Sequence, residues 1–120
     1  MKYELKQQFQ IESARFLPKL PKSHPCANMH GHSFKIVLTL WGDLDPHLGW
    51  VVDYHDITKC MAPLLKLLDH RVLNEVPGLE NPTSELLAKW IYENVVTELP
   101  ILKCVSVMET STTECTYPVR

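Results

Sequence analysis

The run HGHSFKIVLTLW, residues 30 to 41, constrains the fold more than any other part of the sequence. Its alternation of apolar and other residues predicts a strand whose successive side chains point to opposite faces. The positions that share the apolar face are His30, His32, Phe34, Ile36, Leu38 and Leu40. This face must be covered by a core, so the sequence directs two imidazoles toward the side that the core occupies.

The rest of the chain supplies the elements that cover this face. Alternation also predicts strands over residues 3 to 17 and 104 to 110, with a last extended piece ending at residue 117. Between them, residues 53 to 68 and 83 to 99 carry apolar residues at helical spacing, and Pro63 is expected to kink the first helix. The order ββααββ predicts an α+β fold in one domain, residues 1 to 120, with a four-stranded antiparallel sheet and two helices on one face.

Composition excludes several classes of protein. The chain has 120 residues, of which 45 % are hydrophobic and 22 % charged, as is typical of a globular domain. Its net charge of -2 gives no basic footprint, so no nucleic acid and no membrane is expected as a partner. No apolar run is long enough for a membrane span or an export signal. We therefore expect a cytoplasmic protein whose four irregularly spaced cysteines are reduced.

Two short motifs have the composition of a metal or nucleophile site. His30 and His32 project from one strand face about 6 to 7 Å apart, so both can reach one metal ion, or they are hydrogen-bonded histidines at a strand end. A cupin site would add a glutamate where this chain has Ile36 and Val37. Cys26, in the preceding loop, is either a reactive thiol near a cation or an inert loop residue.

Carboxylates supply the second group of candidates. Asp69 can fix the tautomer of the adjacent His70, although His70 also suits the C-terminus of the first helix. Glu109 shares a face with Val105 and Val107 and therefore needs hydrogen-bond donors. Its partner is either the paired N–H groups of a pterin-like heterocycle or an internal salt bridge.

Several motifs in one order carry a resemblance to a known family. They are Cys26-x3-His30-Gly-His32, the segment DPHLGWVVD at 45 to 53, Leu68-Asp69-His70, Leu73-Asn74, the segment PGLENPTSE at 77 to 85, and Glu109-Thr110. Together they resemble the 6-pyruvoyltetrahydropterin synthase superfamily. The similarity is greatest to its 6-carboxy-5,6,7,8-tetrahydropterin synthase branch, which acts in queuosine (7-deazaguanine) biosynthesis.

The resemblance implies a T-fold whose subunits form trimeric barrels, stacked in pairs as a homo-hexamer with active sites between subunits. It implies a zinc-dependent carbon–oxygen lyase that converts 7,8-dihydroneopterin triphosphate to 6-carboxytetrahydropterin, releasing acetaldehyde and triphosphate. By position, Cys26 resembles the general base, and Asp69 and His70 its partner dyad. Glu109 and Thr110 resemble pterin-binding residues, and His30 and His32 resemble zinc ligands.

The chain departs from the family at Arg15, where the family carries a third histidine ligand. A guanidinium has no lone pair to donate to a metal. Zinc could instead take His24 or Cys26 as its third ligand. Alternatively, Arg15 acts as a fixed cation toward the substrate, or the protein is a pterin-binding paralogue without the family activity. A changed reduced-pterin substrate is a further alternative.

Overall fold

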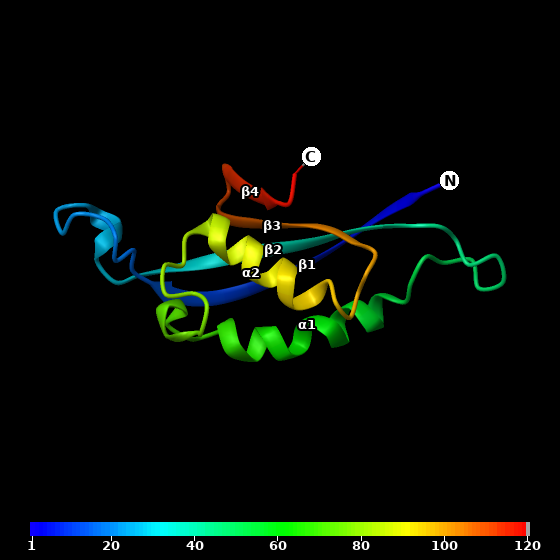
Figure 1. The fold of residues 1–120 in the computed structure, drawn as a ribbon, viewed down its shortest axis with the longest axis horizontal. Helices are drawn as coiled ribbons and strands as arrows, with labels where there is room; N and C mark the ends of the chain where they lie inside the picture. Colours follow the sequence, from blue (N-terminus) through cyan, green and yellow to red (C-terminus); the bar gives the residue numbers. More distant parts are fainter. Residues whose placement is uncertain (120) are drawn as a thin grey trace.

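The computed structural model describes residues 1–119 and contains the six main elements in the predicted ββααββ order (Figure 1). They are β1 (Tyr3–Arg15), β2 (His30–Gly42), α1 (Tyr54–Leu68), α2 (Ser84–Val95), β3 (Leu102–Thr110) and β4 (Thr113–Tyr117), with short 3₁₀ turns η1 (Pro25–Ala27) and η2 (Leu73–Glu75). The α+β class predicted from periodicity is therefore confirmed.

The four strands form one antiparallel sheet in the order β1-β2-β3-β4. β1 and β2 pair along their full length, so that Arg15 lies opposite His30 and Ser13 lies opposite His32. Residues directly opposite each other in an antiparallel pair point to the same face. The sheet register thus brings the Arg15 side chain into the inward-facing row that contains both histidines.

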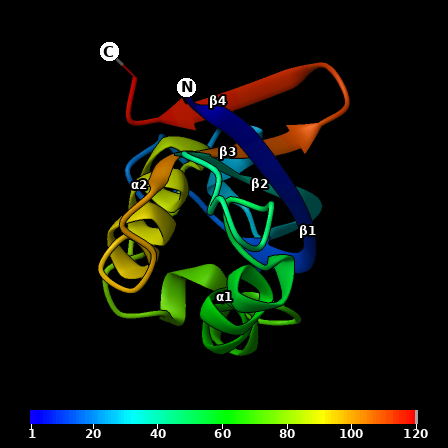
Figure 2. The same cartoon turned by 90° about the vertical axis from the view of Figure 1, so that its right-hand side faces the viewer.

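Both helices lie on one face of the sheet, and the core fills the layer between them (Figure 2). Asp53 begins α1 by accepting a hydrogen bond from the His55 N–H, and Thr83 begins α2 by accepting from the Leu86 N–H. The fully buried side chains include Ile11, Phe34, Ile36, Leu38, Ile57, Met61, Leu68, Leu87 and Ile91. The inward faces predicted for the strands and helices are those that the core contains.

Two of the sequence-based expectations differ in detail from the structure. α2 ends at Val95 rather than at residue 99. Pro100 disfavours continuation because it restricts the residue before it and would clash with the carbonyl four residues earlier. Leu99 nevertheless remains buried. Cys60, which falls on the apolar stripe predicted over residues 53 to 68, is half-buried at the margin of the core rather than within it.

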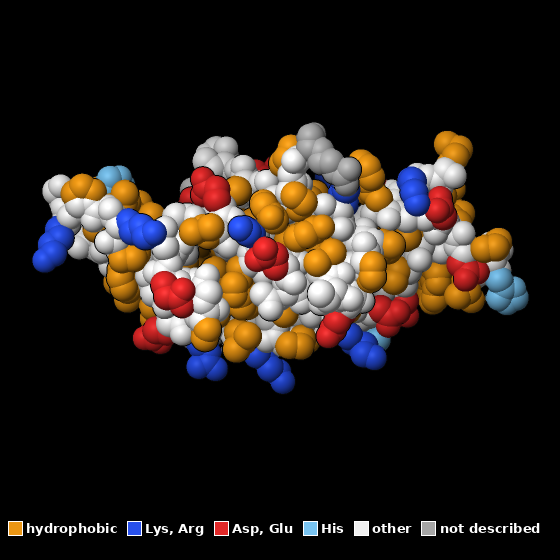
Figure 3. Space-filling model, in the orientation of Figure 1, with side chains coloured by type: hydrophobic (Ala, Val, Ile, Leu, Met, Phe, Trp, Pro, Cys, Tyr) orange, Lys and Arg blue, Asp and Glu red, His pale blue; other side chains and the backbone are white. Residues whose placement is uncertain are grey.

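The molecule is elongated, measuring 58 × 27 × 23 Å, with an irregular loop at each end of the long β1–β2 pair (Figure 1). The loop of residues 16–29 adjoins the histidine end, and the loop of residues 43–53 lies at the opposite end. Charged side chains of both signs are interspersed on the face shown in Figure 3. Neither helix within residues 1–119 has the length and hydrophobicity required to cross a membrane.

Candidate active site

Arg15 is the most deeply buried charged residue of the candidate site, with 3 % of its surface exposed. Its Nη2 donates to Glu109 Oε2, and its Nη1 donates to the Pro82 carbonyl at 3.0 Å. The guanidinium carbon also lies 5.1 Å from the centre of the Phe34 ring. These contacts tie together β1, β2, β3 and the segment before α2. The internal salt bridge considered for Glu109 is therefore present.

His30 and His32 lie beside this ion pair with ring centres 4.9 Å apart. His30 Nδ1 is 2.7 Å from the Asn28 carbonyl, an acceptor, so this nitrogen carries the proton in the neutral ring. Nε2 of His30 is then a buried lone pair with no hydrogen-bond partner in the described chain. His30 Nε2 is therefore oriented to accept a hydrogen bond from a donor or to bind a cation.

The pKa of His32 is lowered, first by burial and then by the positive charge of Arg15, while Glu109 opposes the shift. The net direction is downward, so His32 is neutral near neutral pH. Its Nε2 lies 3.5 Å from Glu109 Oε2, and this approach is accordingly not an ion pair. Glu109 instead compensates the charge of Arg15.

The donor set does not fit the zinc site that the family resemblance implies. Within residues 1–119, no three His, Cys, Asp or Glu side chains are grouped so that they could hold a metal ion. A protein zinc site needs at least three such ligands. His30 and His32 supply two, and the neighbouring inward position holds Arg15, which cannot ligate.

Cys26 lies in η1 and His24 lies just before it, in the loop that adjoins this end of the sheet. His24 Nδ1 accepts a hydrogen bond from the Cys26 N–H at 3.1 Å, and the Cys26 carbonyl accepts from the Leu17 N–H at 2.8 Å. These bonds anchor the backbone of Cys26, whose side chain is partly exposed. They also commit one ring nitrogen of His24, which was expected as a substitute zinc ligand.

Asp69 and His70 form a second group, at the outer edge of β1. Asp69 Oδ1 accepts from the Glu12 N–H at 2.8 Å, and Oδ2 lies 3.1 Å from His70 Nδ1. His70 adopts a left-handed backbone conformation, with φ 57°, and its N–H donates to the Glu12 carbonyl at 2.6 Å. This bend allows two adjacent residues to contact each other, as the sequence-based interpretation of the pair requires.

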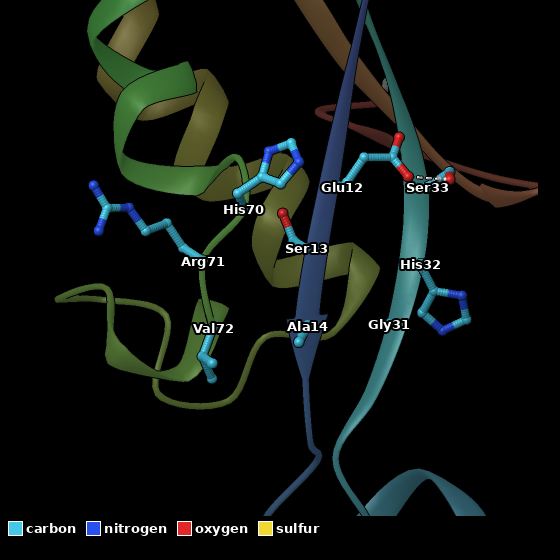
Figure 4. A pocket seen from close by; sticks show the side chains of 9 residues that line it. All are labelled: Glu12, Ser13, Ala14, Gly31, His32, Ser33, His70, Arg71 and Val72. Atoms are coloured by element: carbon cyan, nitrogen blue, oxygen red, sulfur yellow. Dashed lines mark hydrogen bonds between the residues drawn. The ribbon is translucent and has the colours of Figure 1, made fainter.

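The cavity beside this pair has a volume of about 560 Å³ and lies across the ends of β1 and β2 (Figure 4). It is lined by Glu12, Ser13, Ala14, Gly31, His32, Ser33, His70, Arg71 and Val72. Glu12 accepts from the Ser33 hydroxyl and from Gln10, and both bonds lower its pKa. His70 and His32 therefore contribute to one cavity, whereas Cys26 is not among its lining residues.

Protonation of Asp69 is expected to destabilise the fold in acid. The Glu12 N–H and then His70 hold the pKa of Asp69 below its usual range. A carboxyl with a depressed folded pKa stabilises the protein above its unfolded pKa of about 3.9, and this stabilisation is lost as pH falls through the lower folded value. We expect Asp69→Asn to lower the free energy of unfolding at pH 7, with the difference from wild type shrinking below about pH 4.

Urea unfolding at a series of pH values measures this difference. Asp45→Asn is a matched control because the pKa of Asp45 is also lowered, through bonds to the Leu48 and His47 N–H groups, in the loop at the other end of the sheet from Asp69. The difference in free energy of unfolding between Asp45→Asn and wild type should also shrink in acid. Only Asp69→Asn should also perturb His70. A pH-independent effect of Asp69→Asn would contradict the expectation.

Glu109 also lines a smaller cavity, of about 180 Å³, between β3, β4 and the start of α2. Ser84 lines it too, and its buried Oγ has no hydrogen-bond partner in the described residues. The contacts of Glu109 with Arg15 and with His32 both use Oε2. The Oε1 atom and the Ser84 hydroxyl are thus available for a polar ligand. The hydroxyl of Thr110, a residue expected to bind substrate, lies 2.6 Å from the hydroxyl of Thr113 across the β3–β4 turn.

The sequence placed Glu109 on an apolar strand face and distinguished Arg15 from the family's histidine, but it did not pair the two residues with each other. Two opposite charges on the covered face of one sheet are themselves a signal for an ion pair, because a buried charge needs a partner. Nothing in the local sequence indicated that the site would include the Pro82 carbonyl, the Phe34 ring and the Ser84 hydroxyl. Their roles depend on contacts between residues far apart in the chain.

Known proteins are similar to this chain in sequence and in fold. The family model for 6-pyruvoyl tetrahydropterin synthase matches residues 4–119. A 6-carboxy-5,6,7,8-tetrahydropterin synthase of Synechocystis sp. is 35 % identical, with 92 % of this chain and 88 % of the relative covered. Its namesake from Bacillus subtilis is 31 % identical, with 96 % and 84 % covered.

A solved 6-pyruvoyl tetrahydropterin synthase of Caenorhabditis elegans superimposes with a TM-score of 0.91 at 26 % identity, covering 100 % of this chain and 97 % of that chain. The fold agreement thus extends over the whole chain, including both ends of the sheet. The T-fold that the resemblance implied is confirmed. The chain belongs to the 6-pyruvoyl tetrahydropterin synthase family.

Proposed function

We propose that this protein is a 6-carboxy-5,6,7,8-tetrahydropterin synthase. It would convert 7,8-dihydroneopterin triphosphate and water to 6-carboxytetrahydropterin, acetaldehyde and triphosphate. The observation that carries the proposal is the 35 % identity, over 92 % of the chain, to a relative of that name. The open cavity lined by titratable side chains could also accommodate the triphosphorylated polyol side chain of this substrate.

The smaller cavity supports binding of the pterin ring. Glu109 Oε1 can accept a hydrogen bond from the amino or ring N–H of the pterin, and the Ser84 hydroxyl can bond a second ring atom. The Arg15 guanidinium contacts Glu109 Oε2 and orients the carboxylate from behind. Because the carboxylate is held on one oxygen by the protein, the other is preorganised for the ligand.

Proton transfer would involve the loop and the edge of β1. Cys26 would take a proton from the substrate side chain as general base, and His70, oriented by Asp69, would pass a proton on. These groups lie on different parts of one chain, so we propose that copies assemble to bring them together. β1 and β4 are the two edge strands of the sheet, and edge pairing between copies supports a barrel and the expected homo-hexamer.

The implied zinc ion receives no step in this reaction, because the donor set does not fit it. The proposed compartment is the cytoplasm, which is supported by the four free cysteines. The competing proposals are a pterin-binding paralogue without turnover and an enzyme for another reduced pterin.

Acetaldehyde release tests the function directly. Purified protein is incubated with 7,8-dihydroneopterin triphosphate, and acetaldehyde is measured by coupled NADH oxidation with alcohol dehydrogenase. Stoichiometric formation of acetaldehyde and triphosphate is the expected result. Tight pterin binding without acetaldehyde, with and without added zinc, would instead establish the non-catalytic paralogue.

Glu109→Gln is expected to weaken pterin binding by on the order of 100-fold, because an ionised acceptor in a partly buried site is replaced by a neutral amide. Fluorescence titration with a reduced pterin measures the affinity. Glu114→Gln is the matched control, since Glu114 lines the same cavity but is exposed and has no bond to Arg15. Equal affinities for the two variants would remove Glu109 from the proposed binding site.

A further inference from the structure

Two inward-facing side chains at this end of the sheet, His30 and His32, could help to bind a cation, whereas the neighbouring Arg15 could not. The buried His30 Nε2 has no hydrogen-bond partner in the described residues, and the ring of His32 lies 4.9 Å away, measured between ring centres. Arg15 lies directly opposite His30 in the strand register. It completes the row with a positive charge where a third electron-pair donor would be needed.

Arg15 is held in this position from several sides. Pro82 accepts from Nη1 at 3.0 Å, Glu109 accepts from Nη2, and the Phe34 ring lies beside the guanidinium carbon at 5.1 Å. Only 3 % of the residue is exposed. Turning the side chain outward would break both hydrogen bonds and leave Glu109 without its partner, so Arg15 does not readily vacate the site.

Charge compensation in the site is already complete. The negative charge of Glu109 is directed at the guanidinium, and His32 Nε2 lies 3.5 Å from the same carboxylate oxygen. A divalent cation at His30 and His32 would meet the positive charge of Arg15 with no further carboxylate grouped there to offset it. His24, one of the two alternative donors considered, uses Nδ1 to accept a hydrogen bond from the Cys26 N–H.

We infer that the Arg15–Glu109 ion pair takes the place of the family's metal ion in this chain, so that His30 and His32 do not bind a divalent metal. The guanidinium retains a fixed positive charge at this end of the sheet. The two histidines remain available as hydrogen-bonding groups, with His30 Nε2 as an acceptor for a substrate hydroxyl. This inference rests on the donor set and on the ion pair, and it holds whether or not the proposed lyase reaction occurs.

Metal binding by the full-length chain tests the inference. Wild type, Arg15→His and Arg15→Gln are titrated with Zn²⁺ in competition with a chromophoric chelator, and Co²⁺ absorption reports the coordination geometry. We expect no stoichiometric site in wild type. Arg15→His supplies the missing imidazole and should bind one zinc per chain, at least about 100-fold more tightly. Arg15→Gln removes the charge without adding a strong ligand and should remain weak.

Two results would overturn the inference. One is stoichiometric zinc binding by the wild type that is lost in His32→Gln. This result does not depend on whether a variant at position 15 folds. The other is an Arg15→His protein, folded by circular dichroism, that binds zinc no better than wild type. The acetaldehyde assay is read separately. If the wild type binds zinc and releases acetaldehyde, the proposed function is supported and the inference is refuted. If the wild type binds no metal and releases no acetaldehyde, the inference is supported and the proposed function is refuted.

Discussion

Arg15→Ala is expected to lower the free energy of unfolding by about 3 kcal/mol, the largest stability effect among the substitutions considered. Arg15 is 3 % exposed, and its loss leaves Glu109 partly buried without a counter-charge and the Pro82 carbonyl without a donor. Denaturant unfolding followed by circular dichroism measures the change.

A surface ion pair provides the matched control. Lys2 Nζ lies 3.0 Å from Asp43 Oδ2, and both side chains are more than 60 % exposed. Lys2→Ala should leave the free energy of unfolding almost unchanged because water screens the pair. The double variant Arg15→Ala/Glu109→Gln should lose less free energy of unfolding than the two single variants lose together, since no unpaired charge is left. An Arg15→Ala protein as stable as Lys2→Ala would show that the buried pair does not stabilise the fold.

Cys26→Ala is expected to reduce kcat by on the order of 1,000-fold, because it removes the proposed general base. The fold should be unaffected: Cys26 is held by its backbone, through the bonds to His24 and Leu17, and alanine preserves both. Pterin affinity should therefore change little while acetaldehyde release is lost. Single-turnover kinetics with equilibrium pterin binding separate the two quantities.

Cys104→Ala is the control for thiol loss, since Cys104 lies in β3 and is likewise free and partly buried. Its activity should match that of wild type. Parallel loss of activity in both variants, or full activity in Cys26→Ala, would contradict the role proposed for Cys26.

Local sequence patterns determined most of the fold. Period-2 alternation over residues 30 to 41 identified a strand, and its inward positions Phe34, Ile36, Leu38 and Leu40 are fully buried. Asp53 and Thr83 cap the helices near the starts that the sequence predicted. Such features depend on neighbours within a few residues, so a single sequence contains them. The motifs likewise identified the family.

Tertiary structure decided the chemistry at the centre of the site. Arg15 and Glu109 are 94 residues apart, and only the β1–β2–β3 register together with the packing of the segment before α2 brings them into contact. The sequence showed that Arg15 could not be a metal ligand, but three accounts of its role remained open. Its burial, its two hydrogen bonds and its charge partner favour replacement of the metal, because a buried guanidinium is stable only where the fold supplies a carboxylate and acceptors around it.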